Sequence, residues 1–183
     1  MSDLAALKAR AREAAFARRD AAFAAGHPDP SGLLREVLAR HRGRPLSGFL
    51  PMRSEIDPLP ALAAHDGPVG MPVKTPRGEA LRFREWRPGC TLVDAGFGTL
   101  MPAEGNWVVP EVLVVPLVAF DRRGGRLGYG GGFYDRTLAM LRGFGPAVAI
   151  GFAWGAQEAE ALPLEETDQP LDLIVTETEV IEP

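Results

Sequence analysis

The segment "RLGYGGGFYDR", residues 126–136, combines four glycines with side chains suited to binding an anion, a cation and a ring. Glycines lack a Cβ atom, so backbone N–H groups there can approach and surround a phosphate. Arg126 adds a fixed positive charge, and the Asp135 carboxylate is an oxygen ligand suited to Mg²⁺. Three aromatic side chains offer flat faces to a ring: Tyr129, Phe133 and Tyr134. These residue types indicate a phosphate site, although a glycine-rich turn joining two elements explains the glycines equally well.

General nucleotide-binding motifs do not decide between these two interpretations. A Walker P-loop is excluded, because no Lys followed by Ser or Thr ends the segment. The pattern G-x-G-x-x-G also fails, because the glycines are spaced G-x-G-G-G and no acidic residue follows about 20 positions later. The place of the segment is more informative, since it follows the apolar run 111–120 and precedes a predicted helix, 134–144. Open α/β sheets bind ligands at the carboxyl ends of their strands, which favours the phosphate site.

Hydrophobic periodicity and residue propensities predict the elements that position this segment. The predicted helices cover residues 3–25, 32–42, 58–65 and 134–144. The predicted strands are the runs 46–51, 69–74, 79–86, 111–120, 147–154 and 171–178, whereas 87–110 is predicted to be a long loop. Strands that alternate with helices predict one α/β domain over residues 1–183, with three layers and a largely parallel central sheet.

The first predicted helix, 3–25, is rich in alanine and arginine, and Leu4, Leu7, Ala11 and Ala14 recur at the spacing of an apolar face. Residues 1–45 hold nine Lys or Arg against five acidic residues, whereas the whole chain has a net charge of −4. This basic segment could meet nucleic acid, an organellar import system or a phosphate ligand. The acidic balance of the chain and the absence of a nucleic-acid-binding motif argue against nucleic acid, and Asp3, Glu13 and Asp20 argue against a transit peptide.

The composition, with 46% hydrophobic and 24% charged residues, is typical of a soluble globular protein. Cys90 is the single cysteine, so no intramolecular disulfide can form, and the three histidines lack the spacing of metal ligands. The most apolar run, 107–120, is interrupted by two prolines and a glutamate, so it does not form a membrane-spanning helix. We expect a cytoplasmic protein with no membrane partner.

The segment "FDRRGGRLGYGGGFYDR", residues 120–136, closely resembles the hallmark motif of the 5-formyltetrahydrofolate cyclo-ligase family, also called methenyltetrahydrofolate synthetases. Lys8 and Arg12 have the Lys-x-x-x-Arg spacing of this family. "FLPMRSEID", residues 49–57, is similar to the family's strand and loop that carries a substrate-binding glutamate. "GFAWGAQ" and "LPLEETDQPLDLIVTE" are similar to its C-terminal segment, so the resemblance runs from about residue 5 to about residue 180.

The resemblance implies an enzyme that converts 5-formyltetrahydrofolate to 5,10-methenyltetrahydrofolate with ATP and Mg²⁺, on a fold similar to the NagB/RpiA/CoA-transferase-like group. ATP phosphorylates the formyl oxygen, and N10 then closes the ring and expels phosphate, with ADP as the other product. No side chain acts as a nucleophile, so the enzyme mainly positions two ligands and neutralises charge. We expect a monomeric ligase of one-carbon metabolism, and the alternative is a non-catalytic folate- or nucleotide-binding paralogue of the same fold.

Residue by residue, the resemblance implies three groups of site residues. In this family Mg²⁺ would bind Asp135 and Asp168, and Glu55 would accept hydrogen bonds from pterin N–H donors. The ATP-binding residues would be Lys8, Arg12, Arg126, Leu127, Gly128, Tyr129, Gly130, Gly131, Gly132, Phe133 and Tyr134. The folate-binding residues would be Leu50, Glu55, Phe97, Tyr129, Gly130, Gly131, Gly132 and Phe133.

Three residues depart from the family's pattern. Gly131 stands where some relatives have Lys, so the cationic contact is either missing or supplied by Arg136 or Lys74. Thr167 stands where many relatives have His, and Met101 replaces a common acid. These departures leave the implied site residues in place, and the first two motivate the non-catalytic alternative.

Overall fold

The computed structural model describes residues 3–96 and 98–183, and its centre is strand β7 (Val112–Pro116). The side chains of Val112 to Val115 are fully buried, as expected for a strand covered on both faces. Within the described residues, β7 lies in an eight-stranded sheet of order β12-β11-β10-β7-β1-β2-β3-β6. Its other members are β1 (Leu46–Ser47), β2 (Val69–Val73), β3 (Arg82–Glu85), β6 (Trp107–Val108), β10 (Val148–Phe152), β11 (Leu173–Val175) and β12 (Val180–Ile181).

The predicted α/β class and largely parallel sheet are confirmed. Neighbouring strands pair in parallel from β11 through β10, β7 and β1 to β2. Antiparallel strands close both edges, since β12 pairs with β11, and β3 pairs with β2 and β6. The parallel core therefore brings the carboxyl ends of β1, β2 and β7 to one edge of the sheet.

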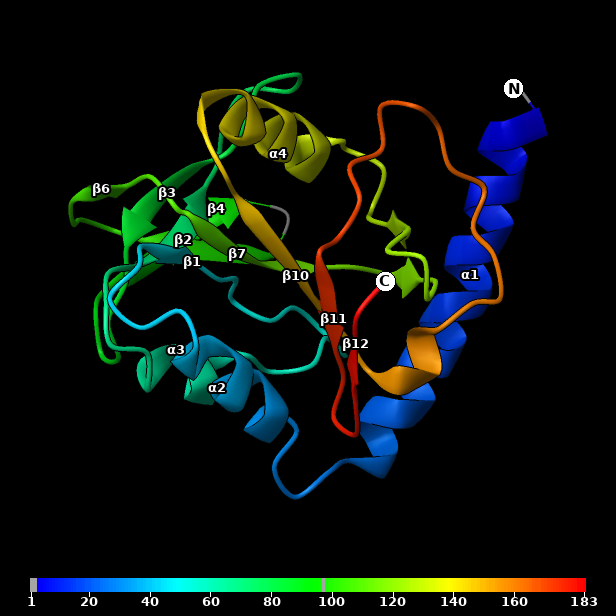
Figure 1. Ribbon diagram of the computed structural model, residues 1–183, viewed down its shortest axis with the longest axis horizontal. Coiled ribbons are helices and arrows are strands. Elements are labelled where there is room, and N and C mark those ends of the chain that lie inside the picture. Colours follow the sequence, from blue (N-terminus) through cyan, green and yellow to red (C-terminus); the bar gives the residue numbers. More distant parts are fainter. Residues whose placement is uncertain (1–2, 97) are drawn as a thin grey trace.

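Helices cover the two faces of the sheet (Figure 1). Helices α2 (Gly32–Ala39) and α3 (Leu59–Ala63) pack with Val112 and Val114 on one face. Helix α4 (Phe133–Phe144) packs with Leu113 and Val115 on the other. Alternate residues of one strand thus serve two separate apolar cores, and three layers result.

Helix α1 (Asp3–Ala25) lies apart from these layers, beside the 3₁₀ turn η1 (Gly155–Gln157) and strand β8 (Ala119–Phe120) (Figure 1). Its extent matches the prediction, but the predicted apolar face is right only in part, because Leu4 and Ala11 are half-buried whereas Leu7 and Ala14 are exposed. Ala15 and Arg19 are the buried residues instead. None of the described helices has the length and apolarity needed to span a membrane.

The predicted strand 111–120 is wrong in its second half. β7 ends at Pro116, whose ring has no N–H to continue the ladder. The chain then forms a hairpin of β8 and β9 (Arg126–Leu127), and Asp121 stabilises its turn by accepting a hydrogen bond from the Gly125 N–H. The glycine-rich segment therefore leads from this hairpin into α4.

The predicted loop 87–110 is also wrong, because it contains β6 and a second hairpin of β4 (Leu92–Gly96) and β5 (Thr99–Pro102). Several predicted strands are shorter than expected, and β1 keeps only two residues of the run 46–51. Strands this short have too few residues to show alternation, so their pairing partners define them.

Candidate functional site

A cleft of about 1570 Å³ opens at the carboxyl ends of β1, β2 and β7. Its wall includes residues 49–50, 72–77 and Pro116, which end these strands or follow them directly. Helix α1, the segment 126–136, residues 165–169 and the hairpin of β4 and β5 also contribute to the wall. The cleft therefore occupies the place at which open α/β sheets bind ligands.

The glycine-rich segment forms one wall of this cleft and depends on glycine at particular positions. Gly130 has φ +97° and Gly132 has φ +65°, a conformation that L side chains rarely adopt. A Cβ atom on Gly131 would lie 2.8 Å from the Phe133 ring. Helix α4 begins directly after Gly132, so its N-terminus, the positive end of the helix dipole, adjoins the cleft.

Two buried polar atoms beside this segment lack a hydrogen-bond partner within the described residues: Arg126 Nε and the Tyr134 hydroxyl. Arg126 is only 5% exposed, and its Nη2 donates to Asp135 Oδ1 at 2.6 Å. Burial lowers the pKa of Arg126, and the nearby Asp135 and Asp168 oppose this effect. Unsatisfied buried donors are rare in native proteins, and here they fit an anionic ligand that supplies acceptor oxygens.

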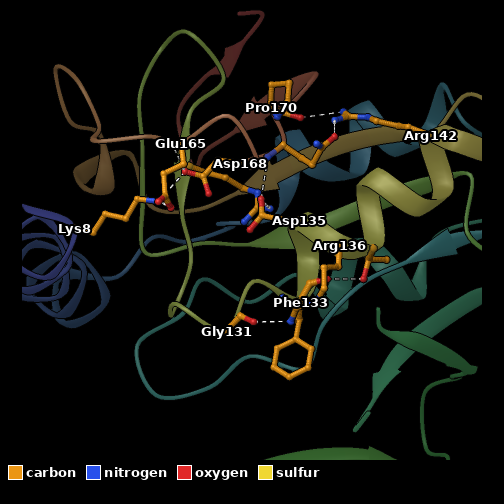
Figure 2. A network of polar contacts seen from close by, with 12 residues as sticks. Lys8, Gly131, Phe133, Asp135, Arg136, Arg142, Glu165, Asp168 and Pro170 are labelled. Atoms are coloured by element: carbon orange, nitrogen blue, oxygen red, sulfur yellow. Dashed lines mark hydrogen bonds and ion pairs between the residues drawn. The ribbon is translucent and has the colours of Figure 1, made fainter. Parts of the chain in front are cut away.

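Helix α1 contributes two more cations to the same end of the cleft. Lys8 Nζ lies 2.7 Å from Glu165 Oε2 and 2.9 Å from Asp168 Oδ2 (Figure 2). Burial alone would lower the pKa of Lys8, but these two carboxylates raise it. Arg12 Nε donates to the Gly128 carbonyl at 2.7 Å and so ties the helix to the glycine-rich segment.

The two carboxylates implied as metal ligands belong to one polar cluster. Asp135 Oδ1 accepts a hydrogen bond from the Gln169 N–H at 2.9 Å, next in the chain to Asp168 (Figure 2). The part of the chain that the structure describes contains no group of three or more His, Cys, Asp or Glu that could hold a metal. Mg²⁺ is commonly held by one or two carboxylates together with substrate phosphates, so two carboxylates beside an anion site fit it.

Glu55 lies in another part of the same cleft and is 6% exposed. Its Oε1 accepts a hydrogen bond from the Tyr129 hydroxyl at 2.7 Å, and its Oε2 accepts one from the Met52 N–H at 2.9 Å. Burial raises the pKa of Glu55, while these hydrogen bonds and Arg19 oppose that rise. The pKa of Tyr129 is raised to about 12, by burial first and by the charge of Glu55 second.

The cleft thus brings together segments from both ends of the chain that the sequence assigned to one site. Lys8, Arg12, Leu50, Glu55, Asp168 and all of residues 126–135 line it. Phe97, the implied folate-stacking residue, lies outside the described residues.

Comparison with known proteins identifies the family of this chain. The model of the 5-formyltetrahydrofolate cyclo-ligase family matches residues 34–177. The chain belongs to this family. It is 50% identical to the 5-formyltetrahydrofolate cyclo-ligase of Escherichia coli over 72 residues, which cover 39% of each chain. It is 36% identical to the enzyme of the same name from Mycolicibacterium smegmatis over 126 residues, or 59% of this chain and 61% of that one. The matched part therefore spans less than two thirds of these relatives.

Two solved structures share the fold over nearly the whole chain. The 5,10-methenyltetrahydrofolate synthetase of Aquifex aeolicus has a TM-score of 0.70 at 27% identity, covering 96% of this chain and 92% of its own. The synthetase of Mycoplasma pneumoniae has a TM-score of 0.63 at 20% identity, covering 96% and 99%, which shows a common fold. Both structural alignments include residues that precede residue 34, where the family match begins.

The three departures from the family's pattern occupy different places. Arg136 Nη2 donates to the Gly131 carbonyl at 2.6 Å, so the guanidinium lies beside the backbone of this residue (Figure 2). Thr167 lines the cleft, and the neighbouring Asp168 is held by Lys8 and by the Glu165 N–H. Met101 lies in β5, paired with Val93.

Arg19 is a residue at this site to which the sequence analysis gave no role. It is 1% exposed, its Nη1 donates to the Tyr129 hydroxyl at 2.8 Å, and its Nε donates to Ser54 Oγ at 2.9 Å. A signal was present, because Lys8, Arg12 and Arg19 recur at the four- and seven-residue spacing of one helix face. Arginines on a helix are usually exposed, so this spacing does not by itself indicate a buried cation.

Proposed function

We propose that this protein is an ATP-dependent 5-formyltetrahydrofolate cyclo-ligase that forms 5,10-methenyltetrahydrofolate, ADP and phosphate. The observation that carries the proposal is that one cleft is lined both by Arg126 with residues 128–132 and by the buried Glu55. A reaction between ATP and a folate needs both ligands in one cavity with their reacting groups adjacent. Family membership supports the same reaction.

The nucleotide end of the cleft would bind and orient the triphosphate of ATP. Arg126 would use its unpaired Nε as a donor to a phosphate oxygen, and Lys8 would exchange a carboxylate partner for a phosphate. The backbone of residues 128–132 and the N-terminus of α4 would add N–H donors. These groups hold the γ-phosphoryl group in place and offset its negative charge during transfer.

Asp135 and Asp168 are the residues that would hold Mg²⁺. Bound there, the ion would neutralise charge on the phosphate oxygens. In the free protein, the same carboxylates balance the positive charges of Arg126 and Lys8. The site therefore has compensating charges both without and with its ligands.

Glu55 would select and orient the folate. A carboxylate with two acceptor oxygens suits the paired N–H donors of a pterin ring, and burial excludes water that would compete for them. Leu50 and Phe133 add apolar wall to the same cleft. Binding in this orientation would present the N5-formyl oxygen to the nucleotide end of the cleft.

The reaction then needs no nucleophile from the protein. The formyl oxygen attacks the γ-phosphorus of ATP, and ADP leaves. N10 attacks the activated carbon, the C–O bond breaks, and phosphate departs with the former formyl oxygen while N10 loses its proton. Each step uses groups of the two substrates, and the protein contributes position and charge.

We also propose that the enzyme acts in the cytoplasm. Cys90 is a free thiol, which supports a reducing compartment. The monomeric state stays a prediction from the sequence.

The test is a turnover assay with the purified full chain, 5-formyltetrahydrofolate, ATP and Mg²⁺. We expect the near-ultraviolet absorbance of the methenyl product to appear only when all three are present, and to stop on chelation of the metal. Absence of ATP-dependent product would contradict the proposal. Tight folate binding without turnover would instead support the non-catalytic paralogue.

A further inference from the structure

Arg19 is a buried cation that lies behind the wall of the cleft. Its side chain is 2% exposed, and it is not among the residues that line the cavity. The guanidinium carbon lies 5.0 Å from the centre of the Phe16 ring and 5.9 Å from that of Tyr129. A charge buried this deeply is costly unless it is paired and hydrogen-bonded, so its partners show what it does.

Those partners lead from α1 directly to Glu55. Arg19 Nη1 donates to the Tyr129 hydroxyl at 2.8 Å, and that hydroxyl donates to Glu55 Oε1 at 2.7 Å. The guanidinium has no acceptor, so the single proton of the tyrosine hydroxyl must point to the carboxylate. Arg19 Nη1 itself lies 3.9 Å from Glu55 Oε1, close enough for charge attraction. The guanidinium thus fixes both the direction of the tyrosine proton and the carboxylate that receives it.

A second contact fixes the guanidinium. Arg19 Nε donates to Ser54 Oγ at 2.9 Å, and that hydroxyl donates in turn to the Asp20 carboxylate. The Ser54 carbonyl accepts a hydrogen bond from the Trp154 ring N–H at 3.0 Å, which anchors this part of the chain to the core. The orientation of Arg19 is therefore set independently of any ligand.

We propose that Arg19 is a positioning residue for the folate-binding step, which holds the Glu55 carboxylate through Tyr129 and balances its negative charge. The inference rests on the proposed function, because Glu55 is taken as the group that receives the pterin. Arg19 does not touch the substrate and acts only through Tyr129 and Glu55.

The groups around Glu55 explain why a cation is needed there. Tyr129 faces it from the glycine-rich segment and Arg19 from α1, while the Met52 N–H binds its other oxygen. Burial raises the pKa of the Tyr134 hydroxyl of α4, and the charge of Glu55 raises it further. Burial raises the pKa of Glu55, and Arg19 and Tyr129 are among the groups that lower it. Removing the positive charge of Arg19 would raise the pKa of Glu55 further. As the pH falls, the carboxylate would then become protonated at a higher pH than in the wild type.

The experiment compares Arg19→Met with Arg18→Met, a matched change at the next residue of α1. Arg18 Nε donates to the Ala156 carbonyl at 2.7 Å, so its bonds go to η1 and away from Glu55. The KM values for 5-formyltetrahydrofolate and for ATP and the kcat are measured from about pH 5 to about pH 8. Arg19→Lys is a second variant that keeps the charge but not the fork of donors.

For Arg19→Met we expect the KM for 5-formyltetrahydrofolate to rise by about tenfold to a hundredfold, with the KM for ATP changed much less. The acid limb, which is the rise in the KM for 5-formyltetrahydrofolate as the pH falls, should move to higher pH. Arg19→Lys should restore the acid limb and only part of the affinity, and Arg18→Met should match the wild type. Tyr129→Phe should weaken folate binding, and adding Arg19→Met to it should cost less than Arg19→Met costs alone.

The outcomes separate this inference from the function on which it rests. If the wild type neither binds nor converts 5-formyltetrahydrofolate, both fail. If the wild type is active and Arg19→Met behaves like Arg18→Met, the positioning role alone is overturned. A loss of kcat with both KM values raised together and an unmoved acid limb would mean a purely structural role and would also overturn it. If Arg19→Met does not fold, Arg19→Lys and the pH profile of Tyr129→Phe decide between these results.

Discussion

Glu55 is placed to bind the folate, but its buried charge lowers the stability of the folded protein. Its carboxylate is buried, and its pKa is raised mainly by desolvation. A raised pKa in the folded state means that folding favours the protonated form. The charged form at neutral pH is therefore less stable than a neutral side chain of the same shape would be.

This cost predicts a pH-dependent effect of Glu55→Gln on stability. The stabilising contribution of Glu55 is fully present below its unfolded pKa of about 4.3 and is lost as the pH rises through the higher folded pKa. The variant lacks this loss, so its free energy of unfolding relative to the wild type should increase from about pH 4 to about pH 7. Urea unfolding at several pH values measures it, and parallel curves for the two proteins would show that the pKa is not raised.

Among individual residues, the sequence identified those that belong to a motif and missed Arg19, which belongs to none. Arg126, Asp135 and residues 128–132 stand out because glycines, a cation and a carboxylate are adjacent in the chain. Glu55 and Asp168 depended on the family resemblance. Arg19 lies 110 residues from Tyr129, its main partner in the cleft wall, and such a contact exists only after folding.

Two elements, α1 and the glycine-rich segment, are joined at two points along one helix face. Arg12 binds the Gly128 carbonyl, and Arg19 binds the Tyr129 hydroxyl. The segment between these contacts and α4 contains Gly130 with φ +97°, where a Cβ atom would lie 3.4 Å from Arg12 Nη2. The backbone conformation at Gly130 therefore leaves the space that the Arg12 guanidinium occupies.

We expect Gly130→Ala to destabilise the protein by about 1 kcal/mol and to raise the KM for ATP more than the KM for folate. The strained conformation costs stability, and displacement of Arg12 alters the nucleotide end of the cleft. Gly143→Ala is the control, because Gly143 lies in α4, has nothing near its Cβ position and is far from the motif, so alanine should stabilise it slightly. Equal stability of Gly130→Ala and the wild type would show that this glycine is not required.

The elements were predicted where a long periodic run specifies them, as in α1 and α4. They were missed where tertiary contacts decide. The two-residue strand β1 exists because β2 and β7 pair with it on both sides. The hairpin of β8 and β9 interrupts an apolar run whose composition gives no sign of a break except Pro116. The face of α1 was predicted correctly only in part, because the fully buried residues Ala15 and Arg19 lie beside the predicted apolar face, and an arginine gives no apolar signal.

The whole molecule forms its site from distant parts of the chain. Lys8 binds Asp168 across 160 residues, and Tyr129 binds Glu55 across 74. The sequence predicted the α/β class and the ligand-binding edge of the sheet, since both follow from the order of strands and helices. The nucleotide end of the cleft, at Arg126, and the folate end, at Glu55, are brought together by the register of five parallel strands. No local sequence pattern specifies this register.

In the proposed reaction, this cleft transfers the γ-phosphoryl group of ATP to the formyl oxygen of the folate before the ring closes. The direct test is a turnover with 5-formyltetrahydrofolate that carries ¹⁸O in the formyl group, followed by mass spectrometry of the inorganic phosphate. We expect one ¹⁸O atom in the phosphate for each methenyl product formed, because that oxygen leaves as part of the phosphate. Unlabelled phosphate, with the label recovered in water, would contradict the claim.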